Sequence, residues 1–218
     1  MFSNGLYAQI FEIQQGSDLY TAIIEVECEE DTCSGLGKVK LYSKENKKLI
    51  QNFESEDLYF YLNENQQPSV NVIQLYNEQS PLIFDDFNFD GSIDLAIRNG
   101  NMGSYRGPTY DVYVYHKNKK KFVLSEELSD LTYLNLGMFY TNHEQKRIIT
   151  FNKSGCCFHV TEEYQVVPKK GLVLVKELIE DATPTVGRDR VEVTERHLIN
   201  GKWQETINYY PIDEYYEN

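Results

Sequence analysis

One short stretch of the sequence, DDFNFDGSIDLAI at residues 85–97, places oxygen-bearing groups at a spacing that suits a metal ion. The side-chain oxygens come from Asp86, Asn88, Asp90 and Asp94, and Ser92 offers its backbone carbonyl. This pattern, with Gly91 at the sharp turn, matches the first positions of the EF-hand calcium loop. Calcium binds about six to eight oxygens at short range, and alternate residues of a tightly curled loop bring them to one point. The sequence therefore predicts a Ca²⁺ site in this loop.

The end of the loop departs from an EF-hand. Ile97 occupies the position where an EF-hand carries a bidentate glutamate, and the residues that leave the loop alternate as in a strand. We therefore expect a loop without flanking helices, with weak calcium affinity in the range of about 10⁻⁴ to 10⁻³ M. The expected role is structural: the ion neutralises the acids and fixes a β-turn connection. The alternative is a turn rich in Asp and Asn that holds no metal.

The chain is strongly acidic. Its 218 residues carry 34 acidic side chains against 21 basic ones, a formal net charge of −13. Such a surface repels phosphate, which argues against nucleic acid and anionic membranes, and it attracts a basic partner. The alternative is that the acids only keep the protein soluble. No run of about twenty apolar residues occurs, so no membrane insertion is expected.

The cysteines indicate an oxidising compartment. Cys28 and Cys33 bracket a polar turn and could close a small disulfide loop, whereas Cys156 and Cys157 are adjacent. An even count, in a tight pair and a vicinal pair, fits the periplasm, and reduced thiols in a cytosolic protein are the alternative. The first thirty or so residues contain no basic segment followed by an apolar one. We therefore expect a periplasmic protein whose signal peptide is not included in this sequence.

Most of the sequence alternates between apolar and polar residues, as β-strands do, from LYAQIFEIQ near the start to RVEVTERHLI near the end. Asn200-Gly201 lies between two such runs and predicts a tight hairpin, because both residues tolerate positive φ. A helix of one or two turns is expected at residues 125–131, with Ser125 as its N-cap. The predicted class is all-β, a sandwich, barrel or propeller, in a single β-rich domain over residues 1–218.

The stretch DDFNFDGSIDLAIRNGNMGSYRGPTYDVYVYHKNKKKFV (85–123), with SGCCFH and NGKW further on, resembles a family of bacterial cell-envelope proteins. That family combines a small, irregular β-propeller fold with one EF-hand-like calcium loop. Its best-understood member is a periplasmic immunity protein that inhibits a peptidoglycan hydrolase delivered into rival bacteria by a type IV secretion system. The likeness covers the central and C-terminal thirds, and the first eighty residues contain no matching motif.

The resemblance implies an immunity protein that inhibits a basic, muramidase-like (lysozyme-like) peptidoglycan hydrolase by occupying its cleft. A basic target agrees with the net charge of −13. We expect the contact in the loop RNGNMGSYRGPTY (98–110), with Ser104, Tyr105 and Arg106 as the partner-binding residues, because Tyr and Arg are common interface anchors. The alternative is that Tyr105 packs locally over a calcium-stabilised turn.

The sequence does not favour an enzyme. It contains no G-x-S-x-G elbow, H-E-x-x-H helix or phosphate-binding glycine loop. Cys157 and His159 stand two residues apart on an expected strand, which does not give the geometry of a nucleophile and its base. A second binding hypothesis is a calcium-stabilised carbohydrate-binding or adhesion module of the cell envelope, in which exposed tyrosines, including those of the tail YYPIDEYYEN, stack on sugar rings.

Overall fold

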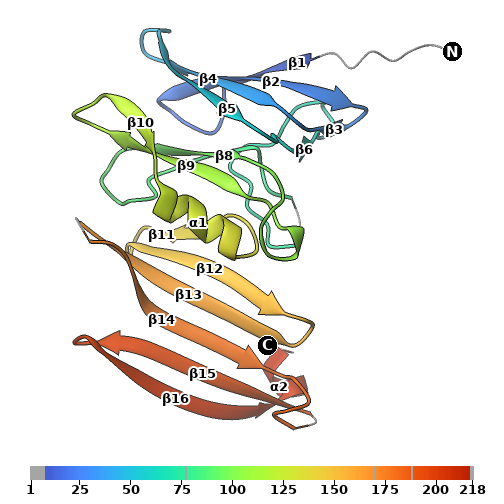
Figure 1. Ribbon diagram of the computed structural model, residues 1–218, viewed down its shortest axis with the longest axis vertical. Coiled ribbons are helices and arrows are strands. Elements are labelled where there is room, and N and C mark those ends of the chain that lie inside the picture. The colour runs from blue at the N-terminus through green and yellow to red at the C-terminus, as the bar shows by residue number, and fades with distance from the viewer. Residues whose placement is uncertain (1–7, 77, 169, 188, 217–218) are drawn as a thin grey trace, which may run out of the picture.

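Figure 1 shows the computed structural model, which describes residues 8–76, 78–168, 170–187 and 189–216. Three antiparallel sheets follow one another along the long axis of the molecule. Strands dominate the described residues, and the predicted all-β class is confirmed. The sheets are stacked in chain order, so a propeller-like arrangement of blades is not confirmed.

The first sheet has six strands in the order β5-β4-β2-β3-β6, with β1 paired to β2. The strands are β1 (Ala8–Ile13), β2 (Tyr20–Glu29), β3 (Thr32–Cys33), β4 (Gly37–Ser43), β5 (Leu49–Ser55) and β6 (Phe60–Tyr61). Alternate residues of β2 and β4 are buried, as the period of the sequence requires. A disulfide between Cys28 and Cys33 joins β2 to β3, and a second one links the neighbours Cys156 and Cys157.

The second sheet lies in the middle, and one of its inner strands, β8, is buried on both faces. Its order is β10-β9-β8-β7, with β7 (Leu82–Asp85), β8 (Asp94–Arg98), β9 (Tyr110–His116) and β10 (Lys121–Leu124). Leu95 and Ile97 of β8 belong to the hydrophobic core shared with the first sheet. Ala96 of the same strand belongs to the second core, together with Leu128 and Leu131 of the following helix. All five residues of β8 are therefore buried.

Helix α1 (Glu126–Leu134) covers the outer face of the middle sheet. The side chain of Ser125 accepts a hydrogen bond from the Leu128 backbone N–H at 3.4 Å, so the predicted N-cap is confirmed, and the helix extends beyond the predicted end. Aromatic residues pack beside it in the second core, among them Phe87 and Phe139, whose ring centroids are 5.4 Å apart.

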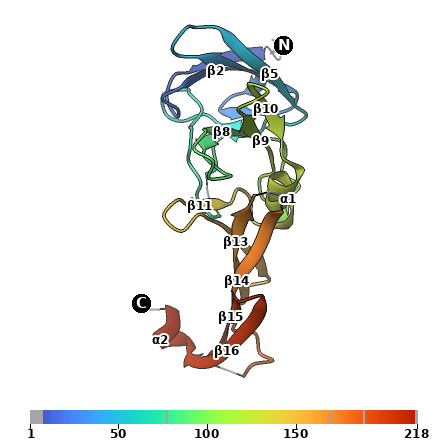
Figure 2. The same cartoon turned by 90° about the vertical axis from the view of Figure 1, so that its left-hand side faces the viewer.

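The third sheet extends away from the first two, and Figure 2 shows it nearly edge-on. Its strands, in sequence order across the sheet, are β11 (Tyr140–Asn142), β12 (Arg147–Ser154), β13 (Phe158–Val167), β14 (Gly171–Asp181), β15 (Arg190–Ile199) and β16 (Lys202–Pro211), and α2 (Ile212–Tyr216) follows. Asn200 and Gly201 form the turn between β15 and β16 with φ of 51° and 75°, which confirms the predicted hairpin. No helix among the described residues has the length and apolar character needed to cross a membrane.

The Cys28–Cys33 disulfide should contribute measurably to stability. Replacing both residues with alanine removes the cross-link, and loss of the entropy restriction on so short a loop costs about 2 kcal/mol in the chain-entropy model. Urea unfolding of the oxidised wild type and the double variant measures the difference. Cys156→Ala with Cys157→Ala is the matched control, because a bond between neighbours closes almost no chain. A larger loss in the control pair would contradict this assignment.

Candidate functional site at the two ends of β8

Strand β8 determines where both candidate sites lie. The acidic loop enters the strand at Asp94, and the predicted contact loop leaves it at Arg98. The two loops therefore stand at opposite ends of one buried strand, about 13 Å apart at a rise of about 3.3 Å per residue. The structure does not bring the predicted metal ligands together with the predicted partner-binding residues.

The acidic loop is curled by backbone hydrogen bonds to its own side chains. The Asp86 carboxylate accepts from the N–H groups of Asp90 at 3.0 Å and Gly91 at 2.7 Å. Asn88 Oδ1 also accepts from the Asp90 N–H at 3.0 Å, and Asp90 Oδ1 accepts from the Ser92 N–H at 2.8 Å. Gly91 has φ of +83°, a conformation in which a Cβ is strained, so the glycine is needed at this turn.

Asp94 anchors the loop from inside the protein. Its side chain is fully buried; one carboxylate oxygen accepts from the Phe87 N–H at 3.0 Å and the other from the Tyr115 N–H at 2.8 Å. Burial, together with the negative charges of Asp86 and Asp90, raises the pKa of Asp94 to about 7, although the two N–H donors oppose the rise. A cation beside these three acids would offset the free-energy cost of keeping Asp94 negatively charged.

The loop fits calcium by the chemistry of its donors. Carboxylates, an amide and a backbone carbonyl are the oxygen ligands that Ca²⁺ prefers. Within the described residues, however, no three acidic, histidine or cysteine side chains are gathered as a metal cage. One positive charge is present at the rim, where Lys117 Nζ lies 3.6 Å from Asp90 Oδ1 and donates to the Asp90 carbonyl at 2.7 Å. Calcium binding therefore stays a prediction.

The contact loop is closed at its base. The Asn99 N–H donates to the Thr109 carbonyl at 2.8 Å, and the Thr109 N–H donates to the Gly100 carbonyl at 3.0 Å. The Asn99 side chain accepts from the Glu56 N–H at 3.1 Å and donates to Asp111 at 3.0 Å. These bonds tie the loop to both the first and the middle sheets, so it is sharply turned and well supported.

The tip of the contact loop has an uncommon backbone conformation. Ser104–Arg106 form a short 3₁₀ turn, η1, in which Tyr105 and Arg106 have φ of +54° and +58°. Adjacent non-glycine residues with positive φ must be held by their surroundings. Close packing contributes: a Cβ on Gly103 would lie 3.0 Å from the Gly107 carbonyl oxygen, so a larger residue would require the backbone here to shift.

Tyr105 projects from this tip and is 58% exposed. Its hydroxyl accepts a hydrogen bond from the Gly155 N–H at 2.5 Å, and the Ser104 hydroxyl donates to Asn152 Oδ1 at 3.1 Å. The contact loop thus meets the turn at residues 155–157, so the structure brings together two motifs far apart in the sequence. Tyr105 is neither buried over the acidic loop nor free: it is an exposed ring held at its hydroxyl.

A cleft beside Tyr105 contains residues that the sequence analysis did not single out. It has a volume of about 500 Å³, and its aromatic lining consists of Tyr59, Tyr61, Tyr76 and Tyr105. Tyr59 and Tyr61 are two residues apart, whereas Tyr76 and Tyr105 come from other segments that only the folded chain brings beside them. The sequence analysis named Tyr105 alone among them; for the other three the sole signal was the count of 17 tyrosines.

The cleft and both loops are therefore part of an all-β protein built from antiparallel sheets. Neither the protein-family models nor the curated proteins contain a match to this chain. Among solved structures, one described as "Structure of a Xanthomonas Type IV Secretion System related protein" is similar, with a TM-score of 0.69 and 22% sequence identity over 95% of this chain and 97% of that chain. At this identity the likeness shows a shared fold.

Calcium should raise the thermal stability of the protein. Calcium that binds the folded loop and not the unfolded chain shifts the equilibrium toward the folded state. The melting temperature is therefore expected to rise on adding millimolar CaCl₂ and to fall with chelator. Asp90→Ala should remove this dependence. Asp130→Ala, which removes an exposed acid on α1, is the matched control and should keep it. Identical melting of the wild type in calcium and in chelator would show that the loop holds no calcium.

The raised pKa of Asp94 gives a pH dependence in calcium-free buffer. A carboxyl group whose folded pKa, about 7, exceeds its model value of 3.8 stabilises the protein below the lower value. That contribution is lost as the pH rises through about 7. Denaturant unfolding in chelator between these pH values should therefore show a falling component that Asp94→Asn lacks. An equal pH slope in both proteins would contradict the assignment.

Proposed function

We propose that this protein is a non-catalytic immunity protein of the periplasm, which inhibits a lysozyme-like peptidoglycan hydrolase and is stabilised by calcium in its acidic loop. The observation that carries the proposal is Tyr105: an exposed aromatic ring at the tip of a closed loop, held in a fixed position. The ring, with Arg106 beside it, would enter the cleft of the hydrolase and exclude the substrate.

The way Tyr105 is held supports this role. An anchor that already has its bound conformation loses little entropy on association. The positive φ of Tyr105, its hydrogen bond with Gly155 and the bonds at the base of the loop all fix it in advance. Central, rigid Tyr and Arg residues commonly contribute most of the binding energy of an interface.

Charge and fold give further support. The net charge of −13 would speed the encounter with a basic enzyme. The similar solved structure is described as related to a type IV secretion system. In the family that the sequence resembles, a secretion system of this type delivers the hydrolase. Two disulfides agree with a periplasmic location.

The alternative, an adhesion or carbohydrate-binding module, is favoured by one observation on the third sheet. Trp203, Ile207 and Tyr209 lie on the same face of the edge strand β16, because they are an even number of residues apart, and each is between 45% and 55% exposed. An apolar row of this kind is suited to a broad, flat ligand surface. In the tail, the Tyr210 and Tyr215 rings lie 5.5 Å apart, and residues 217–218 are outside the described residues.

Inhibition should depend on Tyr105. The wild type is expected to slow lysis of cell walls by a basic peptidoglycan hydrolase, either one encoded nearby or one captured from the same periplasm. Tyr105→Ala should weaken inhibition by about 30-fold or more, the loss of a strong interface anchor. Turbidity of a cell-wall suspension against inhibitor concentration measures the effect.

Tyr209→Ala is the matched control, since Tyr209 is 55% exposed but lies on β16, in another sheet. It should inhibit like the wild type. The inhibitor proposal fails if no envelope hydrolase is slowed. Contact through Tyr105 is excluded if Tyr105→Ala, folded normally, inhibits as well as Tyr209→Ala.

A further inference from the structure

The cleft beside Tyr105 carries positive charge in an acidic protein. Arg98, Arg106 and Lys153 all line it, and no aspartate or glutamate does. Lys153 Nζ lies 4.4 Å from the centre of the Tyr76 ring and 4.9 Å from that of Tyr105. A hollow whose charged lining residues are all positive concentrates anions, even on a chain whose net charge is −13.

Arg98 is the most deeply placed of these cations and is 7% exposed. One terminal nitrogen donates to the Gln79 carbonyl at 3.2 Å, the other bonds Asn101 Oδ1, and the guanidinium lies 5.3 Å from the centre of the Tyr59 ring. Its Nε is the only buried side-chain polar atom in the described part of the chain that lacks a hydrogen-bond partner.

The charge of Arg98 is not neutralised within the described residues. It forms no ion pair there, and the carboxylate of Asp57 acts on it only from beyond ion-pair distance. Burial lowers the pKa of Arg98, although a guanidinium remains protonated at neutral pH. A buried charge without a counter-charge is costly, and a carboxylate that binds a guanidinium in the cleft would offset the cost.

The walls of the cleft suit a ring-shaped ligand with hydroxyl groups. Tyr61, Tyr76 and Tyr105 are each between 57% and 62% exposed, so part of each ring is available for stacking, although Lys153 lies over the Tyr76 and Tyr105 rings. The Tyr59 and Tyr61 hydroxyls are 2.5 Å apart and add polar groups at one side. The volume of about 500 Å³ lies within the usual range for small-molecule sites.

We propose that this cleft binds a sugar that carries a carboxylate, with the sugar ring against the tyrosines and the carboxylate paired with Arg98. The inference is independent of the inhibitor proposal, because the ligand is a saccharide and the deciding residue is Arg98. A simple anion would satisfy the charge but not use the aromatic walls, and a neutral sugar would leave the guanidinium unpaired.

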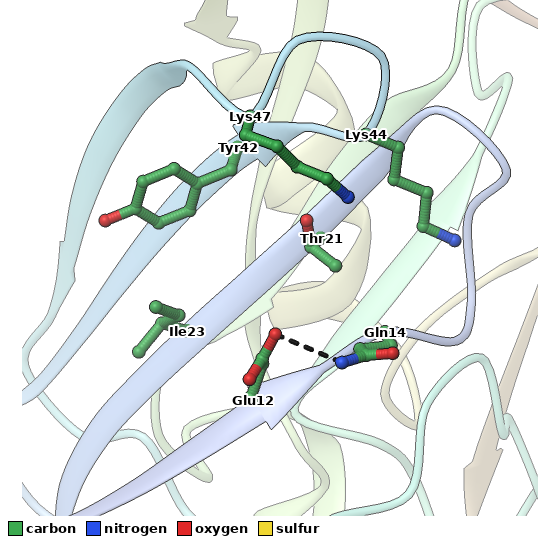
Figure 3. A pocket seen from close by; sticks show the side chains of 7 residues that line it. All are labelled: Glu12, Gln14, Thr21, Ile23, Tyr42, Lys44 and Lys47. Carbon is green, nitrogen blue, oxygen red and sulfur yellow. Dashed lines mark hydrogen bonds between the residues drawn. The ribbon is translucent and has the colours of Figure 1, made fainter.

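A second hollow, on the outer face of the first sheet, lacks these features. Figure 3 shows its lining, in which the ammonium groups of Lys44 and Lys47 and the carboxylate of Glu12 sit at the ends of flexible side chains. Gln14 donates to Glu12 at 3.2 Å, so the acid already has a partner. This lining carries charges of both signs and contains no unpaired buried group, so it points to no particular ligand.

Two probes that differ in one group test the proposal. N-acetylmuramic acid carries a carboxylate on an ether side chain that N-acetylglucosamine lacks, and the rings are otherwise the same. Titration calorimetry on the full chain should show the acid binding at least about tenfold more tightly than the neutral sugar. Lactate, which supplies the carboxylate without the ring, should bind at least about tenfold more weakly than the acid.

Variants identify the cleft as the place of binding. Arg98→Gln should remove the preference for the acidic sugar, whereas Arg190→Gln, at an exposed arginine of β15, should bind like the wild type. Because Arg98 is buried, circular dichroism must show that its variant folds. If it does not, Lys153→Gln at the rim provides the test and should weaken the acidic sugar several-fold while leaving the neutral sugar unchanged.

Three results would overturn the inference: equal affinity for the acidic and neutral sugars, lactate binding as tightly as the acidic sugar, or no binding of the acidic sugar at tens of millimolar. If the acidic sugar does not bind but folded Arg98→Gln loses inhibition of a hydrolase, the cleft instead accepts a carboxylate of the protein partner. Failure of the sugar site leaves inhibition through Tyr105 untouched, so the two proposals fail separately.

Discussion

Burial of β8 on both faces is the constraint on which the rest of the structure depends. The strand is covered by the first sheet on one side and by α1 and its neighbours on the other, yet it begins and ends with charged residues, Asp94 and Arg98. Asp94 is fully satisfied by two backbone N–H groups, which fix the acidic loop. Arg98 keeps one nitrogen without a partner, and the cleft lies at that end. The two ends of one strand therefore differ: the charged group at one end is hydrogen-bonded through both oxygens, and the one at the other end keeps an unpaired nitrogen.

Local features were predictable from the sequence because their causes are local. Alternation reports which side chains face a core, Asn200-Gly201 supplies the two positive φ angles of a tight hairpin, and Ser125 supplies an acceptor for the first turn of α1. The stacking of the sheets was not predictable, since alternation does not say which sheet covers which. The cleft escaped detection for the same reason: Tyr59, Tyr76 and Lys153 are neighbours only after the first, middle and third parts of the chain have packed.

Both proposals place function on the same face. Tyr105 belongs to the contact loop and also lines the cleft, so a protein partner and a saccharide that used this face would exclude each other. The two charge patterns act at different distances. The overall charge of −13 would attract a basic enzyme from afar, and the cations of the cleft would select a carboxylate at contact. Competition between an acidic sugar and an envelope hydrolase would then follow from shared contacts, without any change of conformation.

Amide hydrogen exchange, with and without the hydrolase captured from the native periplasm, tests most directly whether this face is the one that binds. The backbone amides of residues 99–109 and 152–155 should exchange more slowly in the complex, while those of β16 should be unchanged. Protection confined to β16 or to the tail, with the contact loop exchanging as in the free protein, would contradict the placement of the binding site beside Arg98 and Tyr105.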